Sequence, residues 1–170
     1  MLLRHLLSIA LLPFLVVVVV PWALLRGFAD APPTDSSALR LRVFVGVAVF
    51  VWGFAFFAWC VSLFARVGRG TLAPWDPTRH LVVAGPYRHV RNPMISGVAL
   101  MLLGEAAFWG SVAVGLWAAS FLALNHLYFA LSEEPGLERR FGREYRTYKA
   151  EVPRWIPRLR PWAGPDRGSS

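Results

Sequence analysis

Two adjacent carboxylates, Glu133 and Glu134, end a long apolar stretch and are followed by a proline. A second charged segment, GPYRHVR at residues 85–91, carries three Arg and His side chains and leads into another apolar stretch. Carboxylates at the C-terminal end of a helix oppose its macrodipole, so we expect cations to compensate them. The arginines of residues 85–91 are the obvious source. The carboxylates could also serve as acid–base groups.

Three more polar residues, Glu105, Asn125 and His126, lie inside apolar stretches. An ionisable group at membrane depth costs about 2.5 to 3.5 kcal/mol on insertion scales, so each calls for an explanation. His126 precedes Glu133 by two helical turns, which predicts that the two share a face. An interhelical hydrogen bond and a catalytic role both remain open for His126, and Glu105 is typical of an interfacial carboxylate.

The composition of the 170 residues predicts an integral membrane protein. Hydrophobic residues make up 56% of the chain and charged residues 16%, and the apolar residues form long blocks. The net charge of +8 indicates contact with anionic lipid headgroups and not with nucleic acid, because no soluble nucleic-acid-binding element is recognisable. The single cysteine, Cys60, excludes an internal disulfide or a cysteine-based metal site, and we expect no metal.

The pattern predicts an all-α membrane bundle of about four transmembrane helices, followed by a C-terminal interfacial helix. The short Trp109-Gly110 link predicts that the third and fourth spans form an antiparallel hairpin, and Pro93 is expected in the first turn of the third. The expected spans are Leu6–Leu25, Val43–Phe64, Met94–Phe108 and Ser111–Leu131.

The interfacial helix is predicted from an apolar stripe at helical spacing, Phe141, Tyr145, Tyr148 and Val152. The opposite face is basic, with Arg143, Arg146 and Lys149. Membrane anchoring and direct contact with a substrate are both compatible with this stripe.

The distribution of basic residues predicts the orientation. Five arginines lie in residues 66–91 and nine basic residues follow from position 139 onward, so both segments are expected in the cytoplasm. Four spans then place both termini in the cytoplasm, and we expect a bacterial inner (plasma) membrane. The first span is expected to be retained and not cleaved as a signal peptide.

The motif RHLVVAGPYRHVRNPM, an apolar hairpin, and then EEPGLERRFGREYRTYKAEVPRWIPR together resemble the isoprenylcysteine carboxyl methyltransferase and phospholipid methyltransferase family of integral membrane enzymes. The resemblance covers residues 71–160, about half of the chain. It implies an enzyme that transfers a methyl group from S-adenosylmethionine to a lipidic or small amphiphilic acceptor, a carboxylate, an amine or a thiol. Membrane lipids are the expected partners. The oligomeric state is left open.

The resemblance also implies which residues act. Arg91 is expected among the catalytic residues, and Glu134 or His126 would accept the proton of an amine acceptor. The cofactor would be held by Arg79, His80, Leu81, Val82, Tyr87, Asn92, Pro93, Met94, Ile95 and Glu133. The implied organisation is a transmembrane helix pair at 1–67, a cofactor-binding methyltransferase region at 68–163 and a flexible tail at 164–170.

Three positions depart from the family pattern. Its arginine-histidine-proline motif reads Arg91-Asn92-Pro93, and its tyrosine two residues beyond the proline is Ile95. Phe129 stands where the prenylcysteine enzymes place a substrate-binding arginine, which argues against a prenylcysteine carboxylate as acceptor. The alternative hypothesis is a non-catalytic membrane binding or assembly protein that retains the methyltransferase fold.

Overall fold

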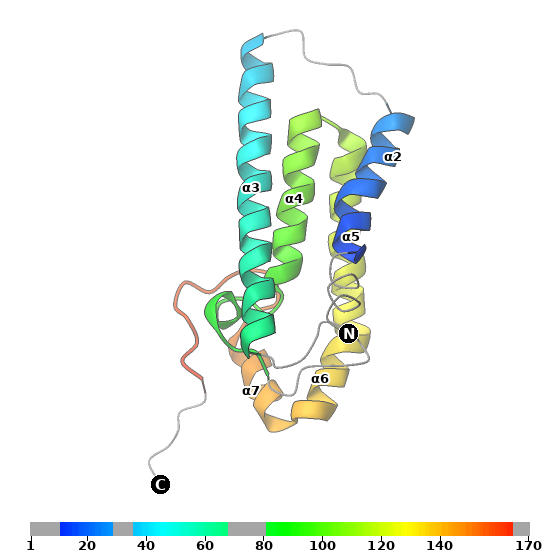
Figure 1. The fold of residues 1–170 in the computed structure, drawn as a ribbon. Helices are drawn as coiled ribbons and strands as arrows, with labels where there is room; N and C mark the ends of the chain where they lie inside the picture. Colours follow the sequence, from blue (N-terminus) through cyan, green and yellow to red (C-terminus); the bar gives the residue numbers. More distant parts are fainter. Residues whose placement is uncertain (1–10, 29–35, 68–80, 165–170) are drawn as a thin grey trace. The chain divides into compact units, whose positions relative to one another are not determined.

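The computed structural model describes residues 11–28, 36–67 and 81–164, and every regular element in these ranges is helical (Figure 1). Arg79 and His80, two of the expected cofactor residues, lie outside the described residues. The elements are a π-helical turn at Leu15–Val19, α2 at Val20–Gly27, α3 at Ser36–Val67, a 3₁₀ turn at Gly85–Arg88, α4 at Pro93–Trp109, α5 at Val112–Tyr128, a π-helical turn at Phe129–Glu133, α6 at Glu134–Phe141 and α7 at Arg143–Glu151.

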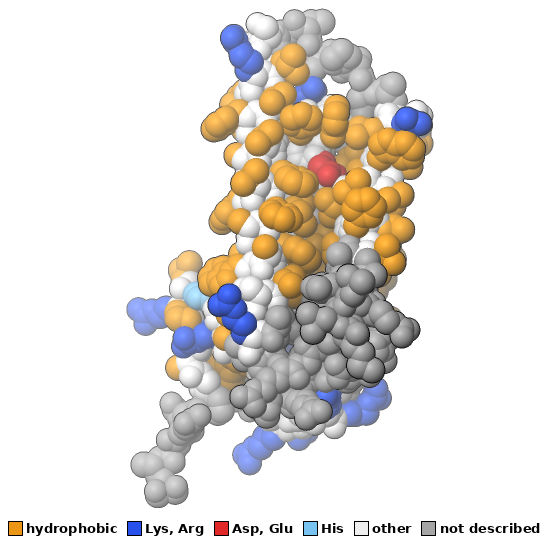
Figure 2. All heavy atoms as spheres, in the orientation of Figure 1, with side chains coloured by type: hydrophobic (Ala, Val, Ile, Leu, Met, Phe, Trp, Pro, Cys, Tyr) orange, Lys and Arg blue, Asp and Glu red, His pale blue; other side chains and the backbone are white. Residues whose placement is uncertain are grey.

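The apolar helices confirm the predicted class of fold. Ser36–Leu63 and Val112–Phe141 are long and apolar enough to cross a bilayer, and Leu11–Gly27 and Pro93–Trp109 are shorter apolar helices. Large apolar side chains stay exposed along them, as with Phe44 at 72% and Leu116 at 64%. Figure 2 shows such side chains covering the visible faces of α2 and α3. Such surfaces are suited to lipid and not to water.

The chain divides into two compact units. The first comprises Met1–Ala58 and Met94–Leu124, and the second comprises Trp59–Pro93 and Asn125–Ser170. Helices α3 and α5 each contribute residues to both units. The three-part organisation expected from the sequence stays a prediction.

Glycines bring α3 and α4 into backbone contact in the first unit. A Cβ added to Gly104 would lie 2.6 Å from the backbone nitrogen of Phe50, and one added to Gly46 would lie 2.5 Å from that of Phe108. Gly53 and Gly97 meet in the same way two turns deeper. Because lipid provides no hydrophobic driving force between helices, such close backbone packing is a main source of their association.

The hairpin between α4 and α5 forms at the position predicted from Trp109-Gly110. Gly110 has a φ of 65°, and its N–H donates to the carbonyl of Ala107 while that of Ser111 donates to Ala106, which is a Schellman ending. The Ser111 hydroxyl then accepts from the N–H of Val114 in the first turn of α5. One glycine and one serine therefore reverse the chain, and α4 and α5 lie side by side (Figure 1).

Two π-helical turns precede prolines. Pro21 and Pro135 each lie two residues beyond such a turn, and neither can donate a hydrogen bond to the preceding turn. The carbonyl of Val16, five residues before Pro21, accepts instead from Nε1 of Trp117 on α5 at 3.0 Å. The wider turn lets the helix continue past the proline.

The helix that continues beyond the second π-helical turn corrects one sequence prediction. Glu133 and Glu134 do not end a helix, because the chain stays helical through α6 to Phe141. That His126 and Glu133 share a face stays a prediction. Arg154 contacts both His126 and Glu134.

The C-terminal stripe has a different role from the anchoring one considered above. The predicted helix is interrupted at Gly142, whose φ is 54°, and α7 begins at the next residue. Tyr145, Tyr148 and Val152 are 3%, 3% and 0% exposed and form a core cluster with Trp162. Leu81 and Val83 pack against this cluster, so the stripe is buried inside the second unit.

Candidate functional site

The charged segment before α4 is a compact turn in the second unit. Gly85 starts it with a φ of 52°, and a Cβ at this position would lie 2.7 Å from Leu63 of α3. The turn buries Tyr87, whose backbone carbonyl accepts a 2.6 Å hydrogen bond from the hydroxyl of Tyr148. Helix α4 then begins at Pro93, as predicted.

Glu134 is the centre of an ion-pair cluster. Its Oε1 accepts from Nη1 of Arg91 and from Nε of Arg154, both at 2.8 Å, and its Oε2 lies 3.2 Å from Nζ of Lys149. The Glu134 side chain is only 5% exposed. The expectation that arginines of residues 85–91 compensate the acidic pair therefore holds for Arg91 and Glu134.

Glu133 has a different environment from its neighbour. It is half-buried, and its side chain forms neither an ion pair nor a hydrogen bond with another described residue. Burial raises the pKa of Tyr87 above its ordinary value, and neighbouring groups that include Glu133 raise it further. Glu133 thus lies near Tyr87, and no described residue pairs with its carboxylate.

Arg91 combines a fixed position with an unused donor. Its backbone N–H donates to the carbonyl of Pro153 at 2.9 Å, and its side chain is 10% exposed and paired with Glu134. Its Nε is buried and has no hydrogen-bond partner among the described residues. A buried guanidinium N–H of this kind is suited to donate a hydrogen bond to an anionic ligand, because leaving the N–H unpaired is costly.

His126 is exposed and lies beside the segment that follows α7. Nε1 of Trp155 donates to its Nδ1 at 3.0 Å, and Nη1 of Arg154 lies 3.3 Å from the same nitrogen. The indole hydrogen bond therefore uses the lone pair of Nδ1. This arrangement supports the hydrogen-bonding role that the sequence left open for His126.

The sequence did not single out Arg154, Lys149 or Tyr148 as parts of the site. Tyr148 and Lys149 were assigned only to the two faces of an amphipathic helix, and Arg154 was given no role. Their partners Glu134 and Tyr87 are remote in sequence, so spacing alone could not reveal these contacts. The available signal was the position of Lys149 and Arg154, two basic residues that follow the adjacent carboxylates Glu133 and Glu134 in the sequence.

The remaining predicted cofactor residues fall in both units. Val82 is buried, and Leu81 packs against the cluster around Tyr148. Asn92 directly precedes α4 in the second unit. Met94 and Ile95 belong to the first unit, where Ile95 packs against the apolar core of α4 and α5.

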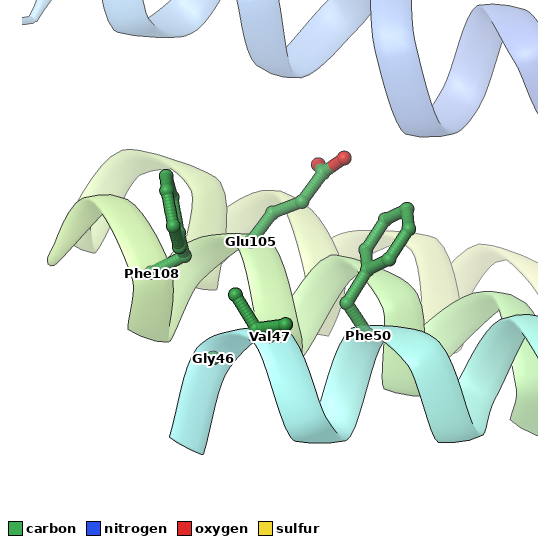
Figure 3. A pocket seen from close by; sticks show the side chains of 6 residues that line it. Gly46, Val47, Phe50, Glu105 and Phe108 are labelled. Carbon is green, nitrogen blue, oxygen red and sulfur yellow. The ribbon is translucent and has the colours of Figure 1, made fainter. Parts of the chain in front are cut away.

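Glu105 lines a separate hollow of about 190 Å³ in the first unit, together with Gly46, Val47, Phe50, Gly104 and Phe108. Figure 3 shows its carboxylate standing between the rings of Phe50 and Phe108. Its Oε2 is buried without a hydrogen-bond partner among the described residues. The predicted cofactor residues that the structure describes do not line this hollow.

The apolar helices and the charged cluster define the chain as an all-helical membrane protein. The sequence profile of the phospholipid methyltransferase family matches residues 41–144, more than half of the chain. The chain therefore belongs to the phospholipid methyltransferase family. Searches of curated proteins and of solved structures gave no match.

The matched range includes every residue proposed for the cofactor and for catalysis, from Arg79 to Glu134. It ends before Tyr148, Lys149 and Arg154, which complete the cluster around Glu134 and Tyr87. The family resemblance inferred from the sequence is confirmed, and the roles of the individual residues stay predictions.

Proposed function

We propose that the protein is a membrane methyltransferase that uses S-adenosylmethionine to methylate a lipidic or small amphiphilic acceptor. The observation that carries the proposal is the division of labour between the two adjacent carboxylates. Glu134 is neutralised by Arg91, Arg154 and Lys149, whereas the side chain of Glu133, near Tyr87, has no ion-pair partner among the described residues. In this proposal Glu134 stabilises the site and Glu133 binds the cofactor.

The residues fit the proposed cofactor. Arg91 offers a carboxylate its buried Nε, which has no hydrogen-bond partner among the described residues, and Glu133 can accept hydrogen bonds from hydroxyl or amino groups. The aromatic ring of Tyr87 can face a sulfonium cation. When bound, S-adenosylmethionine supplies a methyl group on a positively charged sulfur.

Glu134 acts in this proposal by positioning. It holds Arg91 at the start of α4 and joins it to Arg154, which fixes the segment after α7 against the same site. An ionised carboxylate surrounded by three cations is a poor proton acceptor. This geometry weighs against the role of general base expected for Glu134, and the hydrogen bond from Trp155 weighs against the same role for His126.

The state of these two residues bears on the acceptor. Methyl transfer mainly requires that donor and acceptor are aligned in a site without water. A carboxylate or thiolate acceptor needs no base, and an amine acceptor would lose its proton to Glu133 or to water. Position 129 is a phenylalanine, 6% exposed, and not an arginine that could bind a prenylcysteine carboxylate.

Binding and turnover test the proposal in two steps. Calorimetry in detergent should detect S-adenosylmethionine and its demethylated product with comparable affinity, because most contacts are to groups that the two share. Incubation with methyl-labelled cofactor and a total lipid and thiol extract should then label the acceptor. An absence of heat with both ligands at high micromolar protein would contradict the proposed methyltransferase function. Binding without labelling would support the non-catalytic alternative.

A further inference from the structure

The segment after α7, Pro153–Trp162, is here named the C-terminal strap. Its backbone is bonded to the turn before α4 at three points, each 2.9 to 3.0 Å long. The donors and acceptors are Arg91 N to Pro153 O, Arg158 N to His89 O, and Trp162 N to Arg88 O. Side chains strengthen this pairing, because Nδ1 of His89 donates to the carbonyl of Arg158 at 2.7 Å. The strap therefore has a fixed conformation although it contains no helix.

Two aliphatic side chains on this fixed strap are nearly free of protein contacts. Ile156 is 80% exposed and Leu159 is 99% exposed. Full burial of such a side chain contributes about 1.5 to 3 kcal/mol, so exposing both to water is unfavourable. Because the backbone is pinned, neither residue can turn inward without breaking the pairing with residues 88–91.

The strap lies against the end of an apolar helix. Trp155, the residue before Ile156, donates its indole N–H to His126 of α5 at 3.0 Å, and its ring is 6.1 Å from that of Phe129. The same helix exposes Leu127 at 54% and Leu131 at 78%. These exposed leucines lie within a stretch apolar enough to cross a bilayer, and the strap begins beside it.

Arginines accompany the exposed aliphatic residues. Arg160 follows Leu159 directly and is exposed, and Arg158 precedes it. Aliphatic side chains combined with arginines are the pattern of a segment that inserts into the boundary between headgroups and acyl chains. In such a segment the aliphatic residues enter the acyl region and free guanidinium groups contact phosphates. The guanidinium of Arg158 donates to the backbone carbonyl of Glu151 at 2.8 Å, which leaves this role to Arg160.

We propose that the C-terminal strap is a bilayer-interface anchor, with Ile156 and Leu159 inserted among lipid acyl chains and Arg160 at the phosphates. A lipid surface fits better than a protein partner, because the strap is joined to the end of a membrane helix and carries basic residues. The anchor replaces the one expected on α7, whose apolar stripe is buried. It does not depend on the proposed methyl transfer.

The test measures the depth of single labels in nanodiscs that hold one copy of the full chain. In a Cys60→Ala background, Ile156→Cys and Leu159→Cys are labelled with an environment-sensitive fluorophore and quenched by nitroxide-bearing lipids. Leu131→Cys is the control for a lipid-facing position. Ala150→Cys, exposed on α7, is the matched control for a position outside the lipid.

Labels at 156 and 159 should be quenched about as strongly as at 131, and about two-fold or more above 150. Quenching at 156 and 159 equal to that at 150 overturns the proposal. Quenching that appears only with two copies per disc assigns the surface to a second copy and overturns it as well. In discs with anionic lipid, Arg160→Gln should weaken quenching at 159, and an unchanged value refutes the part given to Arg160.

Discussion

Replacement of Glu134 by glutamine separates a structural carboxylate from a binding one. Glu134 is 5% exposed and contacts Arg91 and Arg154, whose side chains are 10% and 18% exposed. Removing one partner of a buried ion pair costs about 3 to 5 kcal/mol, because the remaining charges stay buried. Lys149 is 38% exposed and adds little, so we expect Glu134→Gln to lower the free energy of unfolding by about 3 kcal/mol.

A loss of this size should lower the melting temperature of a chain of this length by about 6 to 12 °C. Cys60 supplies the assay, because its side chain is 0% exposed and reacts with a thiol-specific fluorogenic dye only when the protein unfolds. Glu138→Gln is the matched control, since Glu138 pairs at 2.7 Å only with the same half-exposed Lys149 among the described residues. The control should change stability by less than about 0.5 kcal/mol. Equal melting temperatures for the two variants would show that the cluster around Glu134 contributes no stability.

Three further predictions concern packing and topology. Gly104→Ala should destabilise the protein by about 1 to 3 kcal/mol in the same thermal assay, because its Cβ would meet the backbone of α3. Gly115→Ala is the control and should be neutral or slightly stabilising, because its Cβ would meet only Ala106, at 3.9 Å. Similar losses for both variants would contradict the close packing of α3 and α4. Tyr148→Phe removes the hydrogen bond to the Tyr87 carbonyl and should cost about 1 to 3 kcal/mol, and an unchanged melting temperature would show that this buried carbonyl finds another donor. In a Cys60→Ala background, Ser36→Cys and Thr78→Cys should react with an impermeant thiol reagent from opposite sides of the membrane, and reaction of both from one side would refute the proposed topology.

The fold was largely predictable because long blocks of apolar residues identify membrane helices in a sequence. Long apolar blocks, the Trp109-Gly110 link and Pro93 predicted the hairpin and the start of α4, and each was confirmed. Local signals sufficed here, since a Schellman ending and a first-turn proline depend only on neighbouring residues.

Prediction failed where a local rule was overridden by a neighbouring residue. Pro135 argued for the end of a helix, but a π-helical turn absorbed the missing hydrogen bond and α6 continued. The amphipathic stripe around Tyr145 predicted an apolar surface without saying what would cover it. The cover is partly Trp162, a residue of the same chain that spacing could not connect to α7.

The candidate site was predictable in its parts and not in its pairing. The two carboxylates and the basic turn were recognised, and Arg91 does compensate one carboxylate. Arg91 and Arg154 both pair with Glu134, and Arg154 reaches it from the strap. These partners are remote in sequence, so local spacing does not encode the pairing.

Titration of S-adenosylmethionine into the Glu133→Gln variant tests the central claim most directly. If Glu133 is the free carboxylate that holds the cofactor, the variant should bind about 1 to 3 kcal/mol more weakly than the parent chain, as for other charged hydrogen bonds, while its melting temperature stays nearly unchanged. Glu138→Gln should bind as the parent does, because Glu138 lies outside the proposed cofactor residues. Equal cofactor affinity in both variants would contradict the division of labour between Glu133 and Glu134.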